Sequence, residues 1–142
     1  MHFELVRPEE ETQLPMRATA NSAGYDFFSP ADYTIEPHGK IKIPTNVTVA
    51  LDNADTMRWV LQAYPRSSMA IKRGMAIVNT VGIIDADYCG FEIAIFLENR
   101  SEEPLVIKAG DRFCQGIFVP YLITSDDAAF GERVGGFGST GK

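Results

Sequence analysis

The sequence predicts an all-β fold, and three observations support this class. Apolar and polar residues alternate in short segments, for example at Ile41 and Ile43 and again at Val47 and Val49, as they do in half-buried strands. Turn-forming sequences such as Ala109-Gly110-Asp111 separate these segments. Apolar residues at helical spacing are rare. Many short strands with frequent turns are typical of a sandwich, a jelly roll or a small barrel.

The expected strands follow one another with short connections. In chain order they are Phe3–Val6, the alternating segments around Ile35–Ile43 and Val47–Leu51, and then Met57–Tyr64, Met75–Val78, Phe91–Leu97, Leu105–Ile107 and Arg112–Tyr121. Two short helical turns are also expected. Ser67-Ser68 caps the first, which ends at Gly74, and Ser125-Asp126-Asp127 caps the second, which runs through Phe130.

The length and the charge limit what the protein can be. At 142 residues, the chain is expected to form one domain. Its formal net charge is −6, from 13 Lys and Arg against 19 Asp and Glu. This balance disfavours nucleic acid as a partner, because binding its backbone needs a basic face. An anionic ligand would have to be bound locally, by a few cations, backbone N–H groups or a divalent metal.

Other features concern the compartment. The chain has no run of 18 apolar residues, so we expect no membrane span, and its first residues do not resemble a secretory signal. Cys89 and Cys114 are too few for a disulfide framework and lie among apolar residues, which predicts buried free thiols. We therefore expect a cytoplasmic protein. The two histidines and two cysteines are too dispersed for a zinc site.

The segment 131–142 differs in composition from the preceding chain. It contains five glycines in twelve residues, too many for a packed strand or helix. We expect a domain over residues 1–130 and a flexible arm over residues 131–142. Residues 136–142 match the first seven positions of a P-loop, but the sequence has no helix after them to hold a phosphate.

The side chains of this arm nevertheless suit a nucleotide. Arg133, Ser139 and Thr140 could contact phosphates, and the Phe137 ring could stack on a planar base. The alternative is a disordered glycine-rich terminus with no role.

A second candidate segment is Tyr64-Pro65-Arg66-Ser67-Ser68. An arginine followed by two serines at a helix start offers guanidinium, hydroxyl and free N–H donors to an anion. The alternative is a simple helix cap with a surface arginine.

A third candidate segment runs from Asn79 to Gly90. Its glycines allow a tight hairpin with exposed backbone edges. Asp85 follows Ile83 and Ile84, and a partly desolvated carboxylate there would suit a base that activates water. The alternative is a polar surface turn.

Two further polar residues lie among apolar ones. The amide of Gln115, in the strand after Gly110, could position a water or a phosphate oxygen, or it could simply face solvent. Asp26 lies among aromatic residues and must be paired if it is buried. The alternative for Asp26 is a structural ion pair.

Taken together and in order, these segments resemble the five motifs of the homotrimeric dUTPase family (deoxyuridine triphosphate nucleotidohydrolases). The matching segments are Ala23–Asp26, Pro65–Ser68, Gly82–Gly90, Gly110–Gln115 and Arg133–Gly141. The resemblance implies a distorted jelly-roll barrel or sandwich with a flexible glycine-rich arm. It also implies a homotrimer whose active sites are shared between chains.

The resemblance implies catalytic roles for two residues. Asp85 corresponds to the general base that orients the attacking water toward the α-phosphorus of dUTP, and Gln115 to a residue that helps to hold phosphate and water. The implied products are dUMP and pyrophosphate. The implied physiological role is to limit uracil incorporation into DNA and to supply dUMP for thymidylate synthesis.

The resemblance also implies how substrate is bound. Arg66, Ser67 and Ser68 correspond to phosphate binders. Tyr88 corresponds to a ring that packs under the deoxyribose and excludes a 2′-hydroxyl. The hairpin backbone around uracil corresponds to Asn79, Gly82 and Ile84.

The arm and the metal complete this implied site. Phe137 corresponds to the ring that stacks on uracil, while Arg133, Gly138, Ser139 and Thr140 correspond to the residues that close over the β- and γ-phosphates. Mg²⁺ is held by the triphosphate without a direct protein ligand, and Asp26 corresponds to a carboxylate linked to its water shell. Two departures are Cys114, where the family usually has alanine, and a shorter spacing between Arg133 and Phe137.

Three alternatives remain. A dCTP deaminase shares this fold but needs a glutamate where this sequence has Phe96, with Glu92 and Glu98 elsewhere. A non-catalytic dUTP sensor on the same fold would not need Asp85. A structural jelly-roll protein would not need the Phe137-Gly138-Ser139-Thr140 segment.

Overall fold

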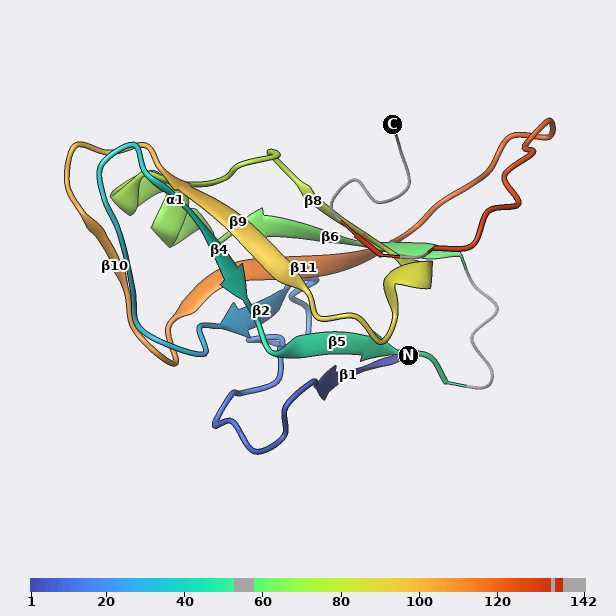
Figure 1. Cartoon of the computed structure of the whole chain (residues 1–142), viewed down its shortest axis with the longest axis horizontal. Helices are drawn as coiled ribbons and strands as arrows, with labels where there is room; N and C mark the ends of the chain where they lie inside the picture. Colours follow the sequence, from blue (N-terminus) through green and yellow to red (C-terminus); the bar gives the residue numbers. More distant parts are fainter. Residues whose placement is uncertain (53–57, 134, 137–142) are drawn as a thin grey trace.

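The computed structural model describes residues 1–52, 58–133 and 135–136. Nearly all of its elements are β-strands, so the predicted all-β class is confirmed (Figure 1). The strands are β1 (His2–Leu5), β2 (Tyr25–Phe28), β3 (Tyr33–Ile35), β4 (Lys40–Pro44), β5 (Val47–Ala50), β6 (Trp59–Pro65), β7 (Met75–Ile77), β8 (Gly82–Asp85), β9 (Ala94–Asn99), β10 (Leu105–Ile107) and β11 (Arg112–Pro120). The helical elements are α1 (Ser67–Arg73) and a single 3-10 turn, η1 (Ala86–Tyr88).

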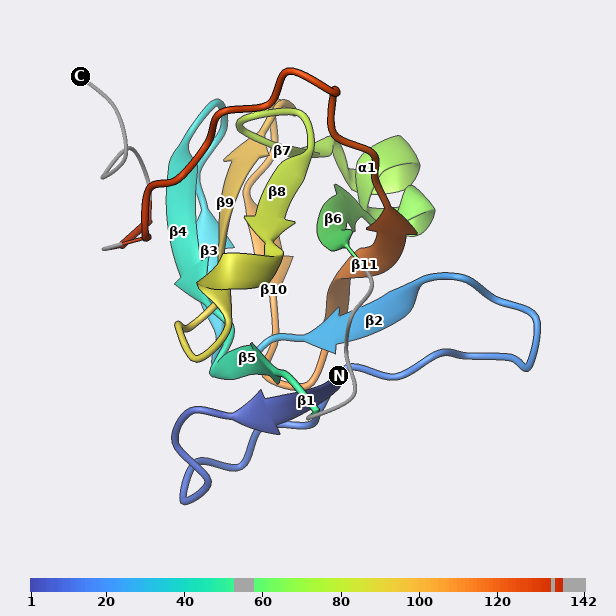
Figure 2. The same cartoon turned by 90° about the vertical axis from the view of Figure 1, so that its right-hand side faces the viewer.

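The strands pair antiparallel in four sheets over the described ranges. A four-stranded sheet has the order β2-β11-β6-β8, and a three-stranded sheet has the order β4-β9-β7. Two smaller sheets pair β1 with β5 and β10 with β3. Figure 2 shows β4 and β9 on one side of the molecule and β6 and β11 on the other. The fold is therefore an open, distorted jelly roll rather than a single closed barrel.

The core fills the space between the two larger sheets. Trp59, Leu61 and Ala63 alternate along β6 and are at most 2% exposed, because every second side chain of a strand points to the same face. Ile95 and Leu97 on β9 are equally buried and belong to the same apolar cluster. The alternation that predicted strands thus selects the residues that hold the sheets together.

The helix α1 follows the prediction at its end but not at its start. Gly74 ends it with a left-handed φ of +68°, which favours glycine. The predicted cap by Ser67 or Ser68 is wrong, because Arg66 occupies the N-cap and no side chain caps the helix. The backbone carbonyl of Arg66 instead accepts the N–H groups of Met69 and Ala70.

Three other expectations need correction. No helix forms from Ser125 to Phe130, where the described chain has only a turn, because Phe130 is 90% exposed and gives a helix no apolar face to bury. The segment Tyr25–Phe28 forms a strand, β2, that its short apolar run did not reveal. Strand β9 begins at Ala94 rather than Phe91, because residues 90 and 93 hydrogen bond back to β5.

The two cysteines are both free thiols. Cys114 is fully buried, as predicted, and burial raises its pKa far above the ordinary value. Cys89 is only partly buried. Within the described ranges, no helix has both the length and the apolar character needed to cross a membrane.

Candidate active site

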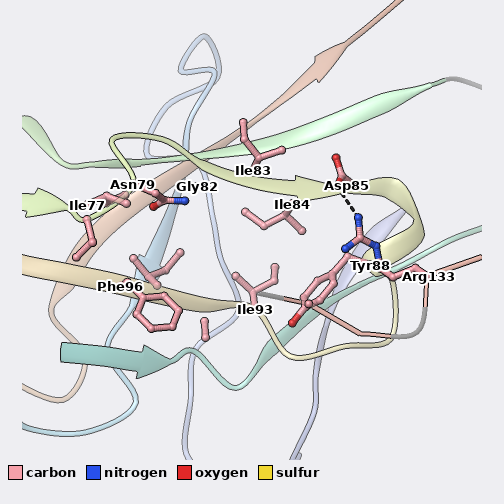
Figure 3. Close-up of a pocket in the computed structure, with 14 residues that line it drawn as sticks. Ile77, Asn79, Gly82, Ile83, Ile84, Asp85, Tyr88, Ile93, Phe96 and Arg133 are labelled. Carbon is pink, nitrogen blue, oxygen red and sulfur yellow. Dashed lines mark hydrogen bonds and ion pairs between the residues drawn. The ribbon is translucent and has the colours of Figure 1, made fainter. Parts of the chain in front are cut away.

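A pocket of about 330 Å³ opens between β8 and β9, and we call it the β8 pocket (Figure 3). Its volume is within the range of small-molecule sites. Isoleucines form much of its wall, and a few polar groups converge on it. The residues that line it include Asn79, Gly82, Ile84, Asp85, Tyr88, Ile93, Phe96, Arg133 and Gly136.

The β8 pocket exists because two consecutive strands join different sheets. β7 pairs with β9, whereas β8 pairs with β6. The turn between them is tight, with the N–H of Thr80 donating to Ile77 O and Thr80 itself at a left-handed φ of +69°. β8 is consequently an edge strand of its sheet, and among the described residues its second edge has no strand partner. This edge presents backbone N–H and C=O groups to a ligand.

Asp85 and Tyr88 lie at one end of this pocket. The alternation along β8 buries Ile84 and leaves Ile83 and the Asp85 side chain about half exposed. The expected desolvation of Asp85 by its two isoleucine neighbours is therefore not present in the single chain. The Tyr88 ring is packed instead, and its partial burial raises its pKa.

Arg133 covers this end of the pocket. Its Nη2 lies 2.5 Å from Asp85 Oδ2, and its Nε lies 2.6 Å from Asp87 Oδ1. The guanidinium carbon is 5.7 Å from the centroid of the Tyr88 ring, within cation–π range. These bonds, with Asp87 the largest contributor, raise the pKa of Arg133. After β11 the chain leaves the sheet and returns to this point (Figures 1 and 2).

A second set of polar residues lies on the same four-stranded sheet, and we call it the Asp26 group: Asp26, Arg66, Arg112 and Gln115. Asp26 is 6% exposed, and its Oδ1 lies 2.9 Å from Arg66 Nε while its Oδ2 lies 3.2 Å from Arg112 Nη1. The predicted pairing of a buried Asp26 is confirmed. Its two oxygens fix two cations at one end of the sheet.

Gln115 lies next to these charges. It pairs with Asp26 across β2 and with Tyr64 across β6, and its amide donates weakly to Pro65 O at 3.4 Å. A Cβ at Gly24 would stand 2.6 Å from Gln115 Oε1. The glycine therefore gives the amide its space.

The β8 pocket and the Asp26 group are far apart within one chain. Gln115 is in register with Tyr64 of β6, while Asp85 is in register with Val60. At about 3.3 Å per residue and about 4.8 Å per strand, this separates Asp85 from Gln115 by roughly 13 Å along the sheet and roughly 10 Å across it. The side chains of Asp85 and Gln115 in one chain are therefore too far apart to contact the same phosphate group.

The structure thus divides the predicted site residues into three sets. The β8 pocket brings together Asn79, Gly82, Ile84, Asp85, Tyr88 and Arg133. Arg66 and Gln115 belong to the Asp26 group, with Ser67 and Ser68 beside them in the first turn of α1. Phe137, Gly138, Ser139 and Thr140 lie outside the described residues.

Two charged residues in these sets escaped the sequence analysis. Arg112 is the second partner of Asp26, and Asp87 is the second partner of Arg133. Arg112 directly follows Asp111 in a segment already singled out, and Asp87 lies two positions after Asp85. Their charge was visible in the sequence, but their partners were not.

The residues do not build a metal site by themselves. No group of three or more His, Cys, Asp or Glu side chains in the described part of the chain is arranged to hold a metal. Both oxygens of Asp26 accept from arginines, so in this arrangement Asp26 is not a direct metal ligand.

Comparison with known proteins gives one consistent result. The family model described as dUTPase matches residues 10–141. The deoxyuridine 5′-triphosphate nucleotidohydrolase of Desulfitobacterium hafniense (strain DSM 10664 / DCB-2) is 41% identical, over 96% of this chain and 92% of the relative. The protein of the same name from Lactococcus lactis subsp. lactis (strain IL1403) is 39% identical, over 98% and 96%.

Solved structures agree with the sequence relatives. The dUTPase from Streptococcus mutans is similar with a TM-score of 0.77 and 32% identity, covering 88% of this chain and 99% of that one. A Staphylococcus bacteriophage 80alpha dUTPase is similar with a TM-score of 0.74 and 25% identity, covering 99% and 98%. Because the family match extends over nearly the whole chain, this chain belongs to the dUTPase family.

Proposed function

We propose that this protein hydrolyses dUTP to dUMP and pyrophosphate. The observation that carries the proposal is the β8 pocket. There Tyr88 and Asp85 bound the edge of β8 that has no strand partner within the described ranges. The names of the two bacterial relatives support the same substrate. The bacteriophage 80alpha dUTPase has been solved with dUPNHPP.

The base and the sugar would be bound by different parts of the pocket. A strand edge offers fixed donors and acceptors, which can pair with the edge of uracil and leave cytosine unsatisfied. Ile84, Ile93 and Phe96 supply apolar walls that leave little room for the thymine methyl group. The packed Tyr88 ring would lie under the deoxyribose and exclude a 2′-hydroxyl.

The chemical step would be carried by Asp85. Its carboxylate accepts a proton from a water molecule, and the water oxygen forms a bond to the α-phosphorus as the bond to the bridging oxygen breaks and pyrophosphate leaves. Gln115, Arg66, Ser67 and Ser68 would hold the phosphates and the water. Asp85 can act only after Arg133 has released it.

The separation of Asp85 from Gln115 supports shared active sites. One chain cannot bring both residues to one phosphorus, but a symmetric assembly can combine the β8 pocket of one chain with the Asp26 group of another. We propose a homotrimer with three such sites. Residues 131–142 act as the arm that closes each site, with Arg133, Phe137, Gly138, Ser139 and Thr140 contacting substrate.

Mg²⁺ would enter with the substrate. The triphosphate offers the oxygen ligands that the chain does not arrange, and the bound metal neutralises part of its charge. A role for Asp26 toward the metal's water shell stays a prediction. We place this activity in the cytoplasm, where it would limit uracil incorporation into DNA and supply dUMP for thymidylate synthesis.

The direct test is pyrophosphate release with Mg²⁺ from dUTP, dTTP, dCTP and UTP in parallel. We expect rapid release from dUTP alone. Ammonia from dCTP would instead indicate a deaminase. Against this, Phe96 lines the pocket where the deaminase needs a glutamate, and Glu92 and Glu98 are paired with Arg7 and Arg100. Tight dUTP binding without hydrolysis would indicate a sensor.

Subunit mixing tests the shared site. Asp85→Asn and Arg66→Gln variants are each expected to be nearly inactive. After unfolding and refolding as a 1:1 mixture, each mixed trimer should contain one site with both native residues, which restores about one quarter of all sites. Separately refolded variants are the control. No recovery in trimers shown to be mixed would contradict sharing.

A further inference from the structure

Three segments far apart in the sequence are joined beside the β8 pocket, and we call this junction the Glu92 clamp: Arg7, Asn46 and Glu92. The Glu92 carboxylate accepts from two nitrogens of Arg7, at 2.9 and 3.2 Å, and from the backbone N–H of Asn46 at 2.8 Å. The side chain of Asn46 in turn bonds the backbone N–H of Arg7 at 2.8 Å and its carbonyl at 3.0 Å.

The Glu92 clamp is largely buried although it contains charged side chains. Asn46 is fully buried and has a left-handed φ of +59°, and the side chain of Glu92 is only 25% exposed. The Arg7 guanidinium holds the pKa of Glu92 below its ordinary value. Such two-pronged arginine–carboxylate contacts fix direction as well as distance.

The Glu92 clamp continues directly into the wall of the pocket. The Tyr88 hydroxyl donates to the backbone carbonyl of Glu92 at 3.1 Å. Phe91 packs against the Tyr88 ring, with centroids 5.3 Å apart. Ile93, the next residue, lines the pocket and is held by bonds to Thr45 and Val47 of the strand region beside Asn46.

We infer that Glu92, held by Arg7 and Asn46, is a positioning residue that fixes the Tyr88 ring and so sets the preference for a deoxyribose over a ribose. This inference rests on the proposed function, in which Tyr88 lies under the sugar. Arg7 precedes residues 10–141, the part that matches the family model. The segment before the matched region therefore contributes to the selectivity of the pocket.

The clamp acts on the sugar side of the pocket and not on the catalytic carboxylate. Asp85 is fixed by the pairing of β8 with β6. The hydrogen bonds of the Glu92 side chain run to Arg7 and Asn46 instead. Loosening the clamp should therefore admit a 2′-hydroxyl while the proton-accepting group stays in place. This separates the effect from a general loss of activity.

The test uses Glu92→Gln, which keeps the side-chain size but removes the charge that holds Arg7. We expect the ratio of kcat/KM for dUTP to that for UTP to fall about tenfold or more, with kcat for dUTP changed less than about threefold. The Kd ratio of UMP to dUMP, from calorimetry, should fall in parallel. Arg7→Gln should lower the ratio by a similar factor. The double variant should not lower the ratio further than either single variant.

The matched control is Asp32→Asn. Asp32 likewise accepts from a cation, Lys108, at 2.7 Å and from a backbone N–H, that of Ala109, at 2.8 Å, but neither Asp32 nor Lys108 lines the pocket. It should leave the dUTP to UTP ratio unchanged. Unchanged ratios in folded Glu92→Gln and Arg7→Gln would overturn the inference, even if both unfold more easily.

Two further outcomes are also decisive. If Glu92→Gln does not fold, Arg7→Lys decides, because it keeps the charge but loses the two-pronged contact, and an intermediate ratio is expected. A wild-type ratio in Arg7→Lys would overturn the inference. A wild-type protein that releases no pyrophosphate from dUTP would contradict the proposed function alone, and the UMP and dUMP affinities would still test the clamp.

Discussion

The β8 pocket and the Asp26 group lie on the same four-stranded sheet but differ in how their charges are held. Asp26 is almost fully buried between two arginines, so its orientation is fixed before any ligand arrives. Asp85 is half exposed, and its partner Arg133 lies outside the regular elements, on the chain after β11. The comparison suggests that the Asp26 group is prepared in advance, whereas the β8 pocket needs a rearrangement before it can act.

Removing the carboxylate of the β8 pocket should have the largest effect. We expect Asp85→Asn to lower kcat for dUTP by about 10³-fold, because among the described residues Asp85 is the carboxylate that lines the pocket, while dUTP binding persists. Pyrophosphate release and calorimetric binding measure the two quantities. Asp87→Asn is the matched control, because Asp87 also bonds Arg133 but does not line the pocket. Normal turnover by Asp85→Asn would remove Asp85 as the base.

Removing the segment that carries Arg133 should have the next largest effect. A chain ending at Glu132 should keep its assembly and its dUMP affinity within about tenfold, and should lose about 10²-fold or more in kcat/KM, since the site can no longer be closed. Sedimentation and pyrophosphate release test this. Arg133→Gln in the full chain separates the guanidinium from the rest of the arm. A truncated protein with full activity would refute the closing role.

A substitution at Gly24 tests whether activity depends on the fixed position of Gln115 in the Asp26 group, and its expected effect is smaller. Gly24→Ala places a Cβ 2.6 Å from Gln115 Oε1, which lies at the end of a flexible side chain. The amide should move with little loss of stability, and kcat should fall about tenfold. The wild type is the control. A kcat of Gly24→Ala equal to that of the wild type would show that the position of Gln115 does not matter.

The smallest expected effect concerns pH. The folded pKa of Glu92 lies below its ordinary value of 4.5, mainly through its hydrogen bonds with Arg7. Its stabilising contribution is therefore fully present above that ordinary value and is lost as pH falls through the folded pKa. Between about pH 5 and pH 3, the Tm of the wild type should fall about 2–4 °C more than that of Glu92→Gln. Parallel curves, measured by circular dichroism, would contradict this.

The sequence predicted much of the local structure and less of its arrangement. The strand at Arg112 and the end of α1 at Gly74 were predicted because periodicity and glycine conformation are local properties. The strand at Tyr25 was missed, because Asp26, Phe27 and Phe28 are all buried and such a segment shows no alternation. The sequence motifs identified candidate residues of both the β8 pocket and the Asp26 group.

The remaining features depend on contacts between distant segments. Arg7 and Glu92 are 85 positions apart, and nothing in either neighbourhood indicates the other. The β8 pocket arises because β7 and β8 join different sheets, a choice that depends on the packing of the entire core. Half exposure of Asp85 follows from the same arrangement, since β8 buries Ile84 instead.

Under the proposed function, the edge of β8 that has no strand partner in the described part of the chain also bears on how base selectivity could change in evolution. A pocket that recognises uracil through peptide groups has the same donors and acceptors whatever side chains the strand carries. Single substitutions along Gly82–Asp85 would alter the fit of the walls but not the hydrogen-bonding pattern. A shift of the strand by one residue, which an insertion or deletion can produce, would change that pattern.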